Sequence, residues 1–174
     1  MKQIVLKSRD EVAEHIETIL QSASDAQMNI IEIAENRDTM WWLEKVKFEK
    51  IGYDPLDSSR PLNFIEQVNQ TFTYLASLSA AELLFQWHTE VTQLTLNLGT
   101  SSGSDIETLE LGGIAVEIFS ATSPSSNNKL NKDIKKVAGT IAAHKYVFFN
   151  CPGIPEGWYK GSRHAAVKIW ALAG

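Results

Sequence analysis

Two acidic residues, Asp105 and Glu117, have the surroundings that most favour catalytic chemistry. Asp105 precedes the segment 106–111, and Glu117 lies within the alternating segment 114–119. The glycine pair between these segments supplies the positive backbone angles of a tight hairpin, so both acids should lie near its open end. If the two carboxylates share an ion, their hard oxygens suit Mg²⁺ or Mn²⁺. Such an ion polarises a phosphate and lowers the pKa of an attacking water.

The length of the hairpin loop decides whether the two carboxylates meet. A two-residue loop would put Asp105 and Glu117 on opposite faces of the sheet. A three-residue loop over 111–113, or a bulge, would instead make them diagonal neighbours, about 7–8 Å apart. A shared metal ion therefore requires an odd loop.

The surrounding residues resemble the PD-(D/E)XK nuclease superfamily, which has the restriction-endonuclease-like fold. In that family an Asp opens one strand and a Glu-x-Lys follows on the next. Both carboxylates hold a divalent metal, and the lysine assists the attacking water. Here Gly-Ser-Asp105 fills the first position and Glu117-Ile118-Phe119 the second, so Phe119 stands in place of the lysine. The resemblance covers roughly 61–150. It implies an α/β fold in which helices flank a mixed central sheet, with an N-terminal helical extension.

The resemblance also implies a set of site residues. Asp105 and Glu117 would be both catalytic residues and metal ligands, and Glu66, on the helix before the strands, would be a third ligand. The alternative for Glu66 is a solvated surface residue. Lys129 is the predicted catalytic replacement for the missing lysine, because it begins the helix that follows Phe119. Lys132 is the reserve candidate, and plain solvation of the lysine-rich helix face is the alternative.

Residue periodicity predicts the elements that position these side chains. Helices are expected over 8–22 and 24–51, from Pro61 to about 76, from Ser79 through 85, and from Asn127, where the apolar stripe extends to Ile141. The loop 52–61 is the best boundary. The predicted strands are 93–98, 106–111, 114–119, 146–150 and a last edge strand ending at Ala171.

Composition limits the class of protein. The chain has 174 residues, 44% of them hydrophobic, which predicts one domain. It comprises a helical section 1–52, a nuclease-like core 61–150, and a C-terminal loop and edge strand 151–174. The absence of an apolar run long enough to span a bilayer, or of a leader, predicts a cytoplasmic protein without a membrane partner. The net charge of −5 means that nucleic acid, the candidate partner, would need a local basic patch.

Two functional classes follow. The first is a divalent-metal-dependent phosphodiesterase acting on nucleic acid. The second is a catalytically degenerate member of the same fold that binds a protein or nucleic acid as a subunit. The adjacent Trp41 and Trp42 would point about 100° apart on a helix, which makes both hard to bury in one monomer. They are either core residues or a homo-oligomer contact made by the N-terminal helices.

Overall fold

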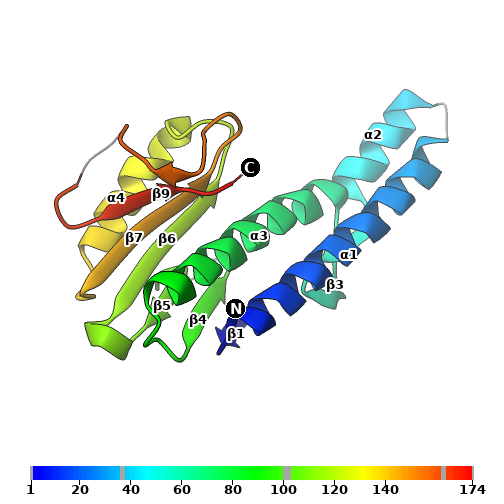
Figure 1. Cartoon of the computed structure of the whole chain (residues 1–174). Coiled ribbons are helices and arrows are strands. Elements are labelled where there is room, and N and C mark those ends of the chain that lie inside the picture. Colours follow the sequence, from blue (N-terminus) through cyan, green and yellow to red (C-terminus); the bar gives the residue numbers. More distant parts are fainter. Residues whose placement is uncertain (1, 36–37, 100–102, 162–163, 174) are drawn as a thin grey trace. The chain divides into compact units, whose positions relative to one another are not determined.

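The computed structural model describes residues 2–35, 38–99, 103–161 and 164–173 (Figure 1). The chain forms two compact units, one made of 1–12 with 76–174 and the other of 13–75. The limits of these units differ from the predicted sections. The reason is that two long helices, α1 (Arg9–Ala34) and α3 (Phe64–Trp87), each run through both units.

A mixed seven-stranded sheet forms the first unit and confirms the α/β class with a mixed central sheet. In sheet order the strands are β1 (Lys2–Leu6), β4 (Leu94–Leu98), β5 (Ile106–Thr108), β6 (Ile114–Ser120), β7 (His144–Asn150), β9 (Lys168–Ala171) and β8 (Gly157–Trp158). The strands from β1 to β6 pair antiparallel, β6, β7 and β9 are parallel, and the edge strand β8 is antiparallel to β9. The short edge strand β1 was not among the predicted strands.

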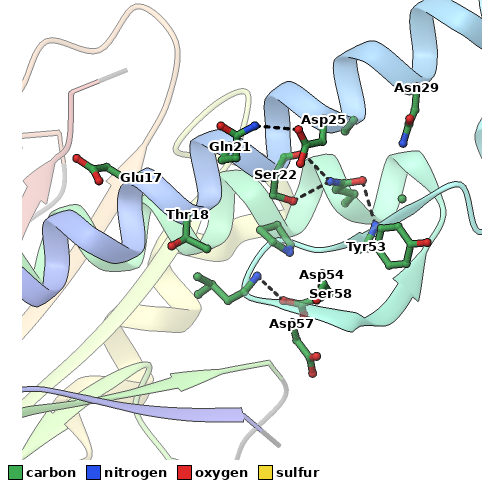
Figure 2. Close-up of a pocket in the computed structure, with 15 residues that line it drawn as sticks. Glu17, Thr18, Gln21, Ser22, Asp25, Asn29, Tyr53, Asp54, Asp57 and Ser58 are labelled. Carbon is green, nitrogen blue, oxygen red and sulfur yellow. Dashed lines mark hydrogen bonds between the residues drawn. The ribbon is translucent and has the colours of Figure 1, made fainter.

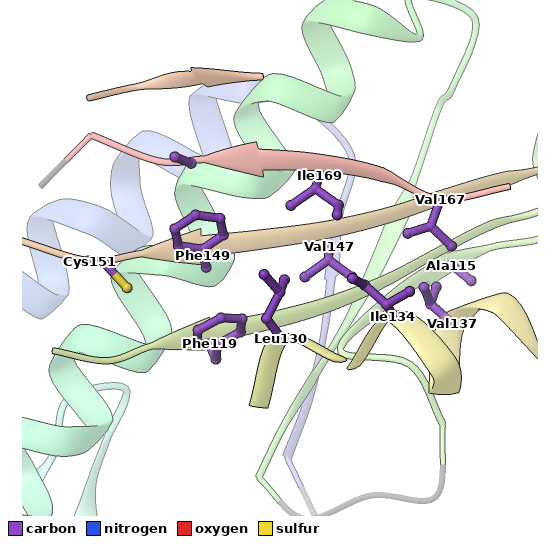
Figure 3. Close-up of a cluster of buried hydrophobic side chains, with 11 residues drawn as sticks. Ala115, Phe119, Leu130, Ile134, Val137, Val147, Phe149, Cys151, Val167 and Ile169 are labelled. Atoms are coloured by element: carbon purple, nitrogen blue, oxygen red, sulfur yellow. The ribbon is translucent and has the colours of Figure 1, made fainter. Parts of the chain in front are cut away.

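Helices cover both faces of this sheet, which is why β6 is buried along six of its seven residues. On one face lies α4 (Lys129–Ala138). Its predicted apolar stripe, Leu130, Ile134 and Val137, is part of a buried hydrophobic cluster (Figure 3). On the other face, the indole of Trp87 in the last turn of α3 stacks on Phe148 at 5.6 Å between ring centroids.

Several boundaries differ from the predicted ones, and no single helix covers the predicted 24–51, because α1 continues to Ala34 and a separate helix covers Thr39–Phe48. Helix α1 continues past Ser22, where it was expected to end. Helix α3 continues past Ser79, because the small residues around Ser79 are buried and tertiary packing outweighs a local capping signal. Strand β5 ends at Thr108, where a 3₁₀ turn over 110–112 begins the loop. Helix α4 ends at Ala138, which leaves Ile141 outside it and fully exposed.

The second unit holds most of α1, the helix α2 (Thr39–Phe48), a hairpin and the first part of α3. The hairpin, β2 (Gly52–Asp54) and β3 (Asp57–Leu62), replaces the predicted loop 52–61. Its turn is stabilised by Asp54, whose buried carboxylate accepts hydrogen bonds from the Leu56 N–H at 3.0 Å and the Tyr74 hydroxyl at 2.9 Å. In the described parts of the chain, none of the helices is both long enough and apolar enough to span a bilayer.

Candidate acid and lysine site

The register of the β5–β6 hairpin brings Asp105 and Glu117 to the same place. Thr108 pairs with Ile114, so the loop spans five residues, 109–113, and its length is odd, as a shared site requires. The expected three-residue loop is therefore wrong in length. Its consequence for the sheet face holds, because any odd loop preserves the parity. The last pair of the ladder is Ile106 with Val116, and Asp105, one residue beyond it, is close enough to Glu117 for its charge to act on that carboxyl.

Asp105 is held in place by the backbone of both neighbouring strands. Its Oδ2 accepts a hydrogen bond from the Ile118 N–H at 2.7 Å, and its own N–H donates to the Val116 carbonyl at 2.8 Å. On the other side, its carbonyl accepts from the Asn97 N–H at 2.8 Å. Burial raises the pKa of Asp105, and the Ile118 N–H and nearby lysine charges oppose this rise only in part.

Glu117 is the most deeply buried carboxylate of the site, with 1% of its surface exposed. Its Oε2 accepts a hydrogen bond from Lys136 Nζ at 2.8 Å. Its Oε1 is buried and has no hydrogen-bond partner among the described residues. Burial raises the pKa of Glu117 to about 7, with a further contribution from the negative charge of Asp105, despite the opposing effect of Lys136.

Helix α4 adds a further acid, the buried Asp133, which the sequence reasoning missed. Its Oδ1 accepts a hydrogen bond from Lys129 Nζ at 2.6 Å, and its buried Oδ2 has no partner within the described parts of the chain. Lys129, Asp133 and Lys136 are spaced i, i+4 and i+7, which places them along one side of the helix. Burial raises the pKa of Asp133 as well.

The lysine beside Glu117 is thus Lys136, whereas Lys129 was predicted there. Lys129 instead pairs with Asp133, and the reserve candidate Lys132 is exposed. Helix α4 lies against β6 and β7, so Glu117, in the middle of β6, meets its last turn instead of its first. Phe119 is buried on the α4 side and stacks on Phe149 at 5.5 Å between centroids.

A sequence signal for Asp133 and Lys136 did exist. Asp133 lies three residues after Leu130 and four before Val137, so it falls inside the apolar stripe of α4. An acid at such a position must be paired or have a perturbed pKa. Lys136 follows it by three residues and so faces the same way.

Glu66 lies in the second unit, where it has a local structural role. Its carboxylate accepts from the Asn63 N–H at 3.1 Å, while the Asn63 side chain accepts from the Glu66 N–H at 2.8 Å. This reciprocal pair is a capping box at the start of α3. The observed position therefore fits the solvated alternative for Glu66, since the residue is exposed.

The carboxylates of Asp105 and Glu117 fit a divalent cation whose remaining ligands come from the substrate and from water. In the described ranges, no group of three or more His, Cys, Asp or Glu side chains converges as a ready-made metal site. Mg²⁺ commonly takes one or two carboxylates together with substrate phosphates and waters. The Oε1 of Glu117, which is buried and has no hydrogen-bond partner in the part of the chain that the structure describes, supplies an oxygen suited to this purpose.

A separate cavity of about 650 Å³ lies in the second unit, between α1 and the β2–β3 hairpin (Figure 2). The buried side-chain amide of Gln67 links α1 to the hairpin: it donates to the Ser22 carbonyl at 3.2 Å and accepts from the Tyr53 N–H at 3.3 Å. The cavity is lined by the acids Glu17, Asp25, Asp54 and Asp57.

The acid and lysine site has three chemical capabilities. It offers two carboxylates to a hard cation, it holds a carboxyl that titrates near neutral pH, and it presents lysine ammonium groups to an anion. Comparison of this chain with protein-family models, with characterised proteins and with solved structures found no match.

Proposed function

We propose that this protein is a divalent-metal-dependent phosphodiesterase, a nuclease of the PD-(D/E)XK type that acts on nucleic acid. The observation that carries the proposal is the 2.8 Å contact between Lys136 Nζ and Glu117 Oε2, beside Asp105. A lysine from α4 thereby supplies the ammonium group that the resemblance requires and that Phe119 does not provide.

The order of the elements supports the finer assignment to the restriction-endonuclease-like fold. A helix, three strands, a helix and a further strand follow one another as α3, β4, β5, β6, α4 and β7. Asp105 directly precedes the middle strand of the three, and Glu117 lies on the next one. In this interpretation, the helical unit 13–75 contains most of the N-terminal extension.

Asp105 and Glu117 would hold the cation, which when bound polarises the scissile phosphate and lowers the pKa of the attacking water. Lys136 favours the ionised form of Glu117 that cation binding needs, and its ammonium is placed to stabilise negative charge developing on the phosphate. Lys129 adds a second positive charge, oriented by Asp133. Glu66 is not part of the proposed ligand set because its carboxylate caps α3.

The distribution of charge supports a polyanionic substrate. Although the whole chain carries −5, the segment 129–174 contains eight Lys and Arg residues against two Asp and Glu residues. This segment includes α4, from which the site lysines come. This excess of positive charge lies in the segment that contributes the site lysines, which supports binding of a polyanion there.

The test is a cleavage screen over single- and double-stranded DNA and RNA, with Mg²⁺ or Mn²⁺ and with EDTA. We expect metal-dependent cleavage of at least one substrate, which Asp105→Ala abolishes. Glu156→Ala, which removes an exposed acid of the same unit, is the matched control and should cleave like the wild type. No cleavage under any condition, or cleavage that survives Asp105→Ala, would overturn the proposal.

The second candidate is a catalytically degenerate protein that binds a partner as a subunit. Exposed apolar side chains of the second unit favour it, because large apolar patches mark interfaces. They include Met28 at 64%, Met40 at 63% and Phe48 at 69% exposure. Trp41 is 37% exposed, which agrees with the expectation that the two tryptophans are hard to bury together in one monomer. Self-association by the wild type, lost in Phe48→Ser, together with an inactive Asp105 site would favour this candidate.

A further inference from the structure

A cavity of about 820 Å³ adjoins the acid and lysine site on the same face of the sheet. Its lining includes Ala115, two residues before Glu117 on β6, and Glu107, the β5 residue that pairs with Ala115. Because side chains two apart on a strand share a face, the cavity continues the surface that presents the two carboxylates. Its volume falls within the range of roughly 300–1,000 Å³ that is typical of small-molecule sites.

Backbone contacts between the loops that line the cavity hold its walls in place. The Ala143 N–H donates to the Gly112 carbonyl at 3.1 Å, and the His144 N–H donates to the Gly113 carbonyl at 3.0 Å. A Cβ at Gly113, where φ is +96°, would come within 3.2 Å of the Ala142 Cα. The hairpin loop and the loop after α4 are thus closely packed, so the cavity is formed before any ligand arrives.

The lining combines two kinds of surface. Leu109, from the hairpin loop, and Ile141, from the loop after α4, are large aliphatic side chains that stand 95% and 102% exposed. The strand wall is polar and carries Gln93, Thr95 and Glu107. Among the described residues, the carboxylate of Glu107 accepts a hydrogen bond at 3.3 Å from the Asn97 amide, and its two oxygens can accept more than one donor.

A flat molecule with apolar faces and a polar edge matches this lining, and a nucleobase has that form. We propose that the cavity is a base pocket, which takes an unpaired base next to the phosphodiester that lies over Asp105 and Glu117. The inference rests on the proposed nuclease function and specifies its substrate as single-stranded or locally unpaired nucleic acid. Leu109 and Ile141 cover the faces of the base, and Glu107 contacts its edge.

Glu107 also selects among bases. An ionised carboxylate only accepts hydrogen bonds, so it favours a base with an exocyclic amino group: cytosine, adenine or guanine. Thymine and uracil lack this group, and their N3–H donor lies between two carbonyl oxygens, which repel a carboxylate. The pocket is therefore specific for amino-bearing bases.

The direct test measures binding of dCMP and dTMP by NMR titration in EDTA, where no cleavage occurs. We expect wild-type protein to bind dCMP about tenfold more tightly than dTMP. Glu107→Gln should reduce this ratio to about twofold, because an amide both donates and accepts hydrogen bonds. Glu156→Gln, the matched control, should retain the tenfold ratio. Ile141→Ser, at a fully exposed position, should weaken binding of both nucleotides several-fold without affecting folding.

Equal binding of the two nucleotides, no binding of either, or a preference that survives Glu107→Gln would overturn the base pocket. Different results would overturn the proposed nuclease function. Selective dCMP binding through Glu107, in a protein that cleaves no nucleic acid, would keep the pocket and reject the nuclease. Equal cleavage of single-stranded oligo-dC and oligo-dT, lost in Asp105→Ala and unaffected by Glu107→Gln, would keep the nuclease and reject the pocket.

Discussion

Lys136 Nζ lies 2.8 Å from Glu117 Oε2, so a lysine with a side chain 44% exposed pairs with an acid on a strand whose side chain is only 2% exposed. Burial alone would lower the pKa of Lys136, but its hydrogen bond and charge interactions with Glu117, together with the charges of Asp105 and Asp133, raise it. Lys136 therefore keeps its positive charge in the pair, while burial keeps the pKa of Glu117 high.

The first prediction concerns the dependence of stability on pH. The pKa of Glu117 is about 7 in the folded protein against an ordinary value of 4.5, so between these values the unfolded chain releases a proton that the folded chain keeps. The free energy of unfolding should therefore fall as pH rises through this window. The fall attributable to Glu117 is on the order of 2 kcal/mol, given about 1.4 kcal/mol per pKa unit and discounting for the solvent around Lys136.

The measurement is urea unfolding without divalent metal at several pH values from 4 to 8. Glu117→Gln cannot ionise and should show a weaker fall than the wild type across this range. Parallel pH profiles for the two proteins would show that Glu117 titrates normally in the folded state.

A second prediction concerns Asp133, a buried acid in the apolar stripe of α4 whose Oδ2 has no hydrogen-bond partner among the described residues. Asp133→Leu should raise the free energy of unfolding by about 1 kcal/mol, because a buried charge is replaced by an apolar side chain of similar size. The partner Lys129, 43% exposed, keeps access to water. Thermal unfolding should shift upward by about 2–4 °C. A lower unfolding temperature for Asp133→Leu would mean that the ion pair stabilises the fold.

A third prediction concerns the second unit. Tyr74→Phe removes the hydroxyl that donates to buried Asp54 at 2.9 Å. We expect a loss of roughly 1–3 kcal/mol in the free energy of unfolding, measured by urea denaturation. Tyr53→Phe, with a side chain about half exposed, is the matched control and should be nearly neutral. Equal effects of the two substitutions would contradict the structural role of the Tyr74 contact.

The sequence predicted those parts of the fold that depend on local periodicity. The segment 114–119 alternates and lies within strand β6, and the apolar stripe of Leu130, Ile134 and Val137 packs as expected. The sequence linked a shared face of Asp105 and Glu117 to an odd loop but left the length of that loop open.

The remaining features depend on contacts between distant segments. Lys136 could be assigned to Glu117 only once the path from β6 to α4 was known, since seven residues separate it from Lys129 along the helix. The β2–β3 hairpin resembles a loop in composition, but Asp54 and Tyr74, twenty positions apart, stabilise it. The edge strand β1 forms only because β4, about ninety residues later, pairs with it.

The most direct test of the proposed site compares Lys136→Met with Lys135→Met in the same metal-dependent cleavage assay. Both variants remove one positive charge from the last turn of α4, but only Lys136 contacts Glu117. We predict that Lys136→Met lowers kcat/KM by about a hundredfold or more, because a lysine at the transition state contributes several kcal/mol. Lys135→Met should stay within about threefold of the wild type, a loss of under 1 kcal/mol at roughly 1.4 kcal/mol per tenfold. Equal activity of the two variants, or cleavage by Lys136→Met at the wild-type rate, would contradict the account.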